Sequence, residues 1–513
     1  MRHAAIAVLA SSLLLAACGN PSDPEGWAKR AASRSRLDEK LEALAQVRKA
    51  PGDRKAAVPA LVEVLTQAPR ARAQAALALG EIGDPAAVKP LVAALDKGSR
   101  DRDVLDANRY IADALGALRA KEAVPALTEL VGSPDGYVQV AAVDALGRIG
   151  DPAAIDILVG IATGAPEPFT AKKALLALGR IGDPRAAPAI MKMLFEERPG
   201  VTFFPEAAFA ASQISRPMGQ PLLAVLEGKD AALSAWARER GVLPGALYAK
   251  SAQLLGDVGG PEAVPALLQK LGYQDSDAGV QMYVRVLAAE SLGRMRAKEA
   301  VKPLAELVIR ERDANVRDRY CDSLARIGDP AVLPQLKAAA AQGDFDQREG
   351  PLVAISRLGG AGELAFIAAS QAKDCASGCD AGRTAAYAGM TARLEAAKAC
   401  SDAGCWAGKL ADPSAAVRDR AALEVGRSGT AANAGALGDA VVRSVADPVE
   451  VEARYHAVLA LGWILSREKV GAAGAAIASK IDAMIAADRG RTLTAGVNED
   501  ALRVATRLRR GAE

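Results

Sequence analysis

The sequence of 513 residues contains few aromatic residues and almost no histidine. Aromatic side chains make up 4% of the chain, and the two histidines are His3 and His456. His3 lies in an N-terminal segment that we expect to be removed, which leaves one histidine. One histidine cannot supply the ligand pair of an H-E-x-x-H metal site, and it would be the sole base for a Ser-His-Asp or Cys-His arrangement. We therefore predict no catalytic residue, no metal and no cofactor, with His456 facing solvent or hydrogen-bonded locally on a helix.

The sequence also lacks a phosphate-binding loop and an excess of one charge. No G-x-x-x-x-G-K-[ST] motif occurs, and the dispersed carboxylates show no spacing typical of a catalytic pair. The 64 basic and 61 acidic residues give a net charge of only +3, so there is no overall field that would attract nucleic acid. These absences argue against an enzyme and against a nucleic-acid partner.

No apolar run in the N-terminal segment is long enough to span a bilayer. Residues 4–17 are apolar, but these 14 residues fall short of the roughly 20 that a spanning helix needs. We interpret residues 1–18 as a signal peptide. Its end, Leu15 to Cys18, reads LAAC and resembles the bacterial lipobox, which implies cleavage before Cys18 and lipidation of Cys18. The alternative is an ordinary signal peptide with an incidental cysteine.

The lipobox also predicts where the protein resides. Gly19 follows Cys18, so the Asp that resembles an inner-membrane retention signal is missing. We expect a lipid-anchored protein of the bacterial cell envelope, on the outer membrane and facing the periplasm. Residues 19–36 contain Pro21, Pro24 and small polar residues, and we expect them to form a flexible tether.

One repeated segment dominates the rest of the sequence. Residues 145–162 read ALGRIGDPAAIDILVGIA, and the glycine after the leucine recurs as Gly116, Gly147 and Gly179, at intervals of 31 and 32 residues. A period of this size indicates stacked structural repeats. Related segments begin at Ala78 (ALGEIGDPAAVKPLVAAL), Ala177 (ALGRIGDPRAAPAIMKML), Ser291 (SLGRMRAKEAVKPLAELV) and Ser323 (SLARIGDPAVLPQLKAAA).

Each repeat is predicted to be a pair of helices joined by a Gly-Asp-Pro corner. Gly150 can end the first helix in a left-handed conformation, Asp151 can cap the second helix, and Pro152 suits its first turn. A further proline inside the second helix predicts a tight turn before it and regular helix from it onward. These prolines are Pro90, Pro125, Pro188, Pro265, Pro303 and Pro334.

The repeat frame resembles a known family. The pattern D-x-x-x-x-V-R-x-x-A-A-x-x-x-G at residues 412–426, together with A-L-G-x-I-G-D-P elsewhere, is similar to HEAT repeats of the phycobilisome-lyase-like subtype. The resemblance implies a right-handed superhelix whose second helices line a concave, partner-binding face. It concerns the repeat frame and no site-level motif, so it does not imply lyase activity.

The predicted fold is therefore an all-α, right-handed α-solenoid of about a dozen stacked helical hairpins. We place the array at residues 37–370, a cysteine-containing repeat at residues 371–405, and C-terminal repeats with a cap at residues 406–513. In the cap, the basic group that begins at Arg503 and ends at Arg510 is expected to lie on a solvated outer side.

Residues 195–250 depart from the repeat pattern and collect aromatic side chains. Phe203, Phe204, Trp236 and Tyr248 are candidates for partner binding, because aromatic residues dominate interface energetics. The alternative is that these rings fill gaps where the repeat packing is irregular.

Four of the six cysteines cluster at Cys375, Cys379, Cys400 and Cys405. In an exported protein such a cluster predicts two disulfides. A helix over residues 383–398 would hold its ends about 24 Å apart, whereas bridged Cα atoms lie within about 7 Å. The local pairs Cys375–Cys379 and Cys400–Cys405 are therefore favoured, and a helix break near Gly389 would reopen the nested pairing. The spacings do not match a zinc knuckle. A further cysteine, Cys321, is predicted to be a buried free thiol.

These features predict a non-enzymatic, membrane-anchored scaffold or adaptor that binds a protein along its concave face. The alternative is a lyase-like protein that handles a small ligand or chromophore in a pocket near residues 203–248. A deep apolar pocket with convergent polar groups would favour the alternative, and a shallow continuous groove would favour the scaffold.

Overall fold

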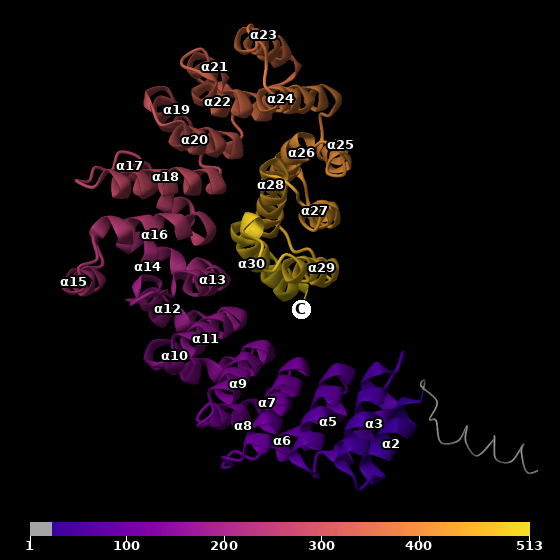
Figure 1. Ribbon diagram of the computed structural model, residues 1–513. Coiled ribbons are helices and arrows are strands. Elements are labelled where there is room, and N and C mark those ends of the chain that lie inside the picture. The colour runs from indigo at the N-terminus through magenta and orange to yellow at the C-terminus, as the bar shows by residue number, and fades with distance from the viewer. Residues whose placement is uncertain (1–22, 513) are drawn as a thin grey trace, which may run out of the picture. The chain divides into compact units, whose positions relative to one another are not determined.

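The computed structural model describes residues 23–512, and α-helices account for most of them (Figure 1). The chain divides into two compact units, residues 1–210 and residues 211–513, which we call the N-terminal and C-terminal units. The strands of the described part are β1 (Glu197–Arg198) and β2 (Val201–Thr202), a two-residue antiparallel hairpin that pairs Glu197 with Thr202 and Arg198 with Val201. The predicted all-α solenoid is therefore confirmed.

The Gly-Asp-Pro corner folds as the sequence predicts. Gly150 follows α9 (Gly136–Ile149) with φ of 76°, in the left-handed region that a residue with a Cβ rarely adopts. The Asp151 side chain accepts a hydrogen bond from the backbone N–H of Ala153 at 2.9 Å. A 3₁₀ turn, η4 (Pro152–Ala154), then leads into α10 (Ile155–Gly164). The predicted turn before each interior proline is confirmed too, since Pro125 is the second residue of its helix and follows a 3₁₀ turn.

In the N-terminal unit, first helices that precede a corner alternate with second helices that follow it. The first helices are α3 (Leu37–Lys49), α5 (Pro69–Ile82), α7 (Arg102–Ala117), α9 and α11 (Pro168–Ile181). The second helices are α4 (Val58–Val64), α6 (Val88–Ala93), α8 (Val124–Leu130), α10 and α12 (Ala187–Phe195). The 3₁₀ turns before them are η1 (Lys55–Ala57), η2 (Pro85–Ala87), η3 (Lys121–Ala123), η4 and η5 (Pro184–Ala186).

The predicted tether is wrong for residues 24–33, which form helix α2 (Pro24–Ser33). Asp23 caps this helix by accepting the backbone N–H of Gly26 at 2.8 Å, and a proline occupies its first position. Ala28 and Ala31 are fully buried, and the Gln67 side chain donates a hydrogen bond to the Ala32 carbonyl at 3.0 Å. Small side chains that look typical of a linker therefore cover the first repeat.

In the C-terminal unit the alternation continues after α13 (Phe204–Ile214), the helix that contains the unit boundary. The first helices are α16 (Pro244–Val258), α18 (Ala278–Met295), α20 (Ala314–Ile327), α22 (Phe345–Leu358), α24 (Ala381–Ala399), α26 (Ala415–Ser428), α28 (Pro448–Leu465) and α30 (Ala495–Ala512). The second helices are α14 (Gly219–Leu226), α17 (Val264–Lys270), α19 (Val301–Arg310), α21 (Leu333–Ala340), α23 (Leu364–Asp374), α25 (Ala403–Lys409), α27 (Ala434–Val441) and α29 (Ala473–Ala487).

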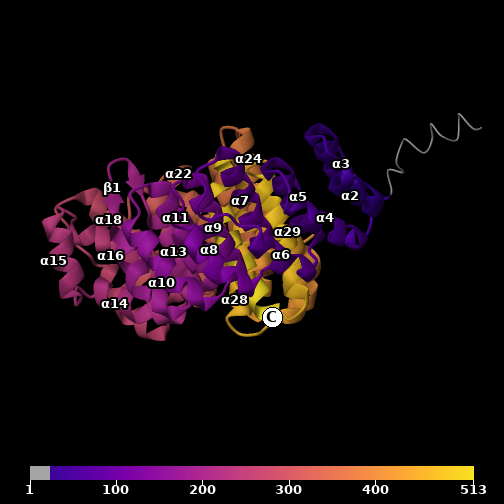
Figure 2. The same ribbon diagram turned by 90° about the horizontal axis from the view of Figure 1, so that it is seen from below.

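Short 3₁₀ turns again precede most second helices of this unit, and one extra helix interrupts the series. These turns are η6 (Arg216–Met218), η7 (Pro261–Ala263), η8 (Lys298–Ala300), η9 (Pro330–Val332), η10 (Ala361–Glu363) and η11 (Ala431–Asn433), and a further turn, η12 (Thr492–Thr494), precedes the first helix α30. The extra helix, α15 (Ala231–Glu239), lies at the edge of the unit in both views (Figure 1, Figure 2). It accounts for the irregular sequence pattern in this region.

The C-terminal unit turns back on itself. Helices α16, α18, α20 and α22 form one row, α24 connects the rows, and α26, α28 and α30 form a second row that faces the first (Figure 1). The inner face of this unit is therefore built by first helices, while α17, α19, α21 and α23 lie on the outside (Figure 1). The expectation that second helices line the concave face is wrong for this unit.

Glycines in the first helices allow successive repeats to pack at backbone distance. A Cβ added to Gly147 would lie 2.7 Å from the Cα of Ala177 in the next first helix, and one added to Gly116 would lie 2.9 Å from the Cα of Ala145. Real Cβ atoms do not approach backbone this closely. The glycine of the repeat frame is thus a requirement of stacking rather than of backbone conformation.

We expect Gly147→Ala to destabilise the N-terminal unit by about 1–3 kcal/mol, because the added methyl group forces α9 and α11 apart. Urea unfolding followed by circular dichroism measures this change. Gly160→Ala is the matched control, since Gly160 lies in helix α10 with nothing within 4 Å of an added Cβ. The control should be neutral or slightly stabilising. Equal midpoints for the two variants would contradict the close-packing argument.

Candidate functional site

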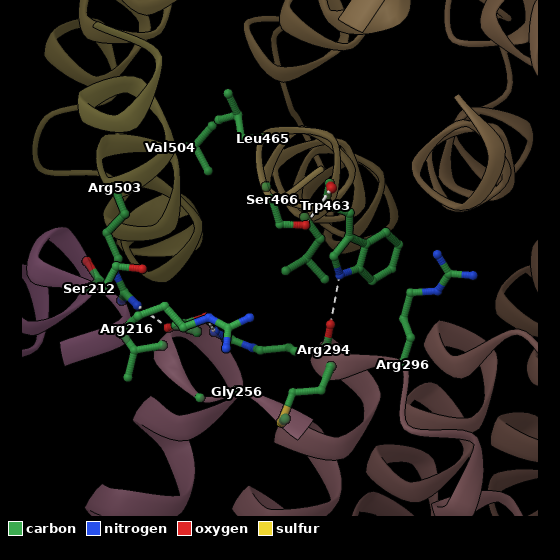
Figure 3. A pocket seen from close by; sticks show the side chains of 18 of the residues that line it. Ser212, Arg216, Gly256, Arg294, Arg296, Trp463, Leu465, Ser466, Arg503 and Val504 are labelled. Atoms are coloured by element: carbon green, nitrogen blue, oxygen red, sulfur yellow. Dashed lines mark hydrogen bonds and ion pairs between the residues drawn. The ribbon is translucent and has the colours of Figure 1, made fainter. Parts of the chain in front are cut away.

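The inner face of the C-terminal unit is covered by helices of its own second row. Trp463 of α28 donates its indole N–H to the carbonyl oxygen of Arg294 in α18 at 2.8 Å (Figure 3). Arg503 of α30 forms an ion pair of 2.8 Å with Asp257 of α16. The face that the sequence analysis assigned to a partner is therefore occupied, in this unit, by the chain itself.

A cluster of buried charges lies where the row of helices changes direction. Asp419 of α26 and its carboxylate have no solvent exposure. One carboxylate oxygen accepts hydrogen bonds from Nε of Arg357 at 2.8 Å and from Nε of Arg393 at 3.0 Å, and the other faces Nδ1 of His456. These four side chains come from α22, α24, α26 and α28. The cluster therefore ties four successive first helices together.

The buried cluster stays ionised because its charges compensate one another. Burial alone would raise the pKa of Asp419, but the charges of Arg357 and Arg393 and the hydrogen bond from His456 hold it well below its ordinary value. Burial likewise opposes the charge of Arg357, which is 1% exposed, yet Asp419, Glu452 and Asp322 raise the pKa of this guanidinium. A carboxylate whose pKa falls on folding stabilises the fold above its unfolded pKa of about 4. This contribution is lost only when the pH drops below that value.

His456 has both ring nitrogens engaged inside this cluster. Nε–H of Arg326 donates to Nε2 of His456 at 3.5 Å, which places the ring proton on Nδ1, where it is donated to Asp419. The histidine is 1% exposed. The expectation of a solvent-facing histidine is therefore wrong. His456 is instead hydrogen-bonded, but to side chains of other helices, and this imidazole is not open to a substrate.

A cavity of about 660 Å³ separates the two rows of helices near their ends. Figure 3 shows Arg216 and Arg294 on one side of this cavity and Leu465 and Val504 across from them, with Arg503 extending from the helix of Val504 toward Arg216. Its volume lies within the range of about 300–1,000 Å³ that is usual for small-molecule sites. The cavity is not the deep apolar pocket that the alternative function predicted, because arginine side chains form much of its walls.

Two carboxylates hold two of the arginines in this cavity. Asp257 pairs with Arg294 at 2.7 Å and with Arg503 at 2.8 Å. Asp500 pairs with Arg503 at 3.2 Å and lies 3.7 Å from Arg294. Burial would raise the pKa of Asp257, but the charges of Arg294 and Arg503 lower it. These pairs join the ends of α16 and α18 to α30.

The two candidate aromatic residues of the N-terminal unit differ in exposure. Phe203 is fully buried, with the guanidinium of Arg198 5.0 Å from its ring centre. Phe204 is half-buried at the start of α13. A ring without exposure cannot contact a partner, so Phe203 is a core residue.

The two candidates of the C-terminal unit are half-buried on different helices. The guanidinium of Arg240 lies 4.6 Å from the ring centre of Trp236. Tyr248 meets Tyr273 edge to face, with ring centres 5.7 Å apart. None of the four candidate aromatic residues lines the cavity. Partner binding by Phe204, Trp236 and Tyr248 stays a prediction.

The cysteine pairs lie at turns between helices. Cys375 is bonded to Cys379 and Cys400 to Cys405, with Cα atoms 4.5 and 5.4 Å apart. Helix α24 runs unbroken between the two pairs, as the argument for local pairing required. Cys321 is a buried free thiol, as predicted, and burial raises its pKa.

Other predicted features lie at the two ends of the chain. Cys18, the predicted lipidation site, lies outside the described residues. No helix of residues 23–512 is long and apolar enough to cross a membrane. At the other end, Arg503 and Arg507 line the cavity instead of a solvated outer side, which corrects that expectation.

The N-terminal unit carries an exposed aromatic pair that the sequence analysis did not single out. Tyr137 of α9 is 75% exposed and Phe169 of α11 is 61% exposed. They occupy equivalent positions in successive repeats, since both lie ten residues before the glycine of the frame, Gly147 or Gly179. Alignment of the repeats on these glycines was the signal that could have found them.

A recurring ion pair links successive first helices and was also missed. Arg148 reaches back to Asp113 at 2.7 Å, and Arg180 reaches back to Asp144 at 2.6 Å. Arg357, which stands at the same place in its repeat, reaches Asp322 at 2.7 Å. The arginine after the frame glycine was the available sequence signal.

The repeated helical hairpins define the protein as an α-solenoid. A model of HEAT repeats matches residues 32–109, 105–174 and 281–352, and a model of the PBS lyase HEAT-like repeat matches residues 171–196. The chain thus contains HEAT repeats, and one of them matches the phycobilisome-lyase-like subtype. A comparison with curated proteins found no match.

Several solved structures are similar to this chain at low identity. Kap95 from a complex with Nup1 is 13% identical with a TM-score of 0.37, covering 98% of this chain and 65% of that chain. Yeast importin-beta (Kap95p) is 14% identical with a TM-score of 0.41, covering 98% and 70%. The CpcE–CpcF complex of phycocyanin lyase from Nostoc is 22% identical with a TM-score of 0.26, covering 59% and 94%. The chain thus spans less than two thirds of the first of these structures, and the likeness concerns the fold alone.

We expect Asp419→Asn to lower the free energy of unfolding of the C-terminal unit by about 3–5 kcal/mol, because it leaves buried guanidinium groups without their shared anion. Chemical denaturation at pH 7 measures the change. Asp439→Asn is the control, since Asp439 forms an exposed ion pair of 2.7 Å with Lys480 and such pairs contribute about 0–1 kcal/mol. Similar losses for both variants would refute a special role of the buried cluster.

Proposed function

We propose that the protein is a membrane-anchored scaffold that binds a protein partner on the first helices of its N-terminal unit. HEAT-repeat solenoids are typical of protein-binding scaffolds, since stacked repeats present a continuous surface. The observation that carries the proposal is the exposed pair Tyr137 and Phe169. Large exposed rings at one repeat position are costly in water and suit burial against a partner.

Charged side chains on the same two helices supply a polar rim of the kind that protein interfaces use. The ammonium group of Lys173 lies 5.4 Å from the ring centre of Phe169. The ion pair of Arg180 with Asp144 lies on the same two helices, α9 and α11. An apolar centre with charges of both signs around it favours a folded protein over a highly charged polymer.

We expect the double variant Tyr137→Ser/Phe169→Ser to weaken partner binding at least about thirtyfold, because aromatic anchors each contribute about 2 kcal/mol or more. Crosslinking in isolated envelopes, followed by mass spectrometry, identifies the partner and the crosslinked helices. Titration of that partner against both forms then gives the affinity ratio.

The control for this experiment is Tyr283→Ser, which removes a ring that is 60% exposed on α18 of the other unit. It should leave binding unchanged. All three forms should keep the same helical circular dichroism. A partner that binds the double variant as tightly as the unmodified protein would refute this surface.

The proposed anchor is the lipid on Cys18, and the proposed location is the periplasmic face of the bacterial outer membrane. The lipobox-like LAAC segment supports the anchor, and the two disulfides suit an oxidising compartment such as the periplasm. A lipid anchor leaves the whole array free to meet a partner.

We expect Cys18→Ser to move the protein from the membrane fraction to the soluble fraction, since the thiol that carries the lipid is gone. Fractionation and immunoblotting measure the distribution. Cys321→Ser, at a buried free thiol, should leave the distribution unchanged. Retention of the Cys18 variant in membranes would refute the proposed lipid anchor, but it would not bear on the proposed protein-binding surface.

A further inference from the structure

The cavity of the C-terminal unit contains more arginines than its carboxylates neutralise. Asp257 and Asp500 form ion pairs with Arg294 and Arg503. These two carboxylates therefore neutralise only two of the lining arginines. The lining holds an excess of two positive charges. The lining arginines are Arg216, Arg294, Arg296, Arg503 and Arg507, and the lining carboxylates are Asp257, Glu299 and Asp500.

Two of the remaining arginines are poorly solvated. Nε of Arg296 is buried and has no hydrogen-bond partner, and its guanidinium lies 5.5 Å from the ring centre of Trp463. Burial lowers the pKa of Arg296, and the neighbouring charges of Arg427 and Arg467 lower it further. Burial also lowers the pKa of Arg507, which Asp257 only partly offsets. An anion that enters this cavity would form charge-assisted hydrogen bonds that the protein leaves unmade.

The cavity offers an apolar wall opposite the cations. Leu465 and Val504 lie across from Arg216 and Arg294, and the indole of Trp463 lies beside Arg296 (Figure 3). The indole N–H is already donated to the Arg294 carbonyl at 2.8 Å, so this ring is fixed and offers only its apolar surface. A ligand that fits both walls carries a compact anionic group and an apolar or aromatic part.

We propose that this cavity binds a small organic phosphate. A phosphate monoester carries a charge of about −1.5 to −2 at neutral pH and three terminal oxygens, which matches an excess of two positive charges. The planar guanidinium group of arginine binds phosphate through bidentate hydrogen bonds. The volume of about 660 Å³ accommodates a phosphate with an organic group attached. This site is independent of the protein-binding surface on the N-terminal unit.

Calorimetric titration of the full chain with phenyl phosphate, at fixed ionic strength, tests this proposal. We expect saturable binding at one site. The double variant Arg296→Gln/Arg507→Gln should bind at least about tenfold more weakly, because two unpaired donors to the anion are lost. Neither side chain forms an ion pair with the protein, so the variant should keep the circular dichroism and unfolding midpoint of the unmodified chain.

The control variant Arg310→Gln/Arg489→Gln removes two exposed arginines of the same unit and changes the net charge equally. It should bind phenyl phosphate with unchanged affinity. No saturable binding to the unmodified chain, or equal affinities for the two double variants, would overturn the site. Benzoate should bind at least about tenfold more weakly than phenyl phosphate, and equal affinity would overturn the assignment to phosphates.

Discussion

The negative charge of the Asp419 carboxylate is buried away from water, so neighbouring side chains must neutralise it. The architecture of the C-terminal unit depends on which helices supply these side chains. Its partners Arg357, Arg393 and His456 lie on three other first helices. A buried ion cluster rarely adds much stability compared with an apolar core, but removing one member costs several kcal/mol. Such a cluster therefore selects one arrangement of its helices, because any other leaves a charge unpaired. Here the selected arrangement is the one in which the second row faces the first.

The packing of the second row against the first, which we call the closure of the C-terminal unit, decides which surfaces remain accessible to other molecules. In the C-terminal unit, ion pairs and the Trp463 hydrogen bond fill the inner face, and what remains open is a cavity of small-molecule size. In the described residues of the N-terminal unit, helix packing runs from each repeat to the next, and the first helices expose Tyr137 and Phe169. The same type of repeat thus produces two kinds of surface. Its first helices are covered where a second row faces them within the unit, as in the C-terminal unit, and are exposed where no such row is present, as in the described residues of the N-terminal unit.

The sequence was sufficient to predict the repeat and insufficient to predict the closure. The corner at Gly150, the 3₁₀ turns before the prolines and the local cysteine pairs each follow from contacts within about 30 residues. The contact of Arg357 with Asp419 spans 62 residues, and that of Arg326 with His456 spans 130. A repeat period carries no information on such pairs, because each helix alone is compatible with an open array. For the same reason the cationic cavity was not foreseen, since its walls come from distant repeats.

One position of the repeat explains both the stacking and the closure. The arginine after the frame glycine pairs with an aspartate of the previous repeat in the N-terminal unit, as Arg148 does with Asp113. At the same position in the C-terminal unit, Arg357 keeps that pair with Asp322 and adds Asp419, while Arg427 donates to the Ala325 carbonyl of the facing row. Facing rows thus bring several such arginines onto one inner surface. In the Asp419 cluster two arginines share one carboxylate, and the rows pack together there. At the cavity, where Arg294 occupies the same repeat position, the lining arginines outnumber the lining carboxylates, and a cationic space remains between the rows.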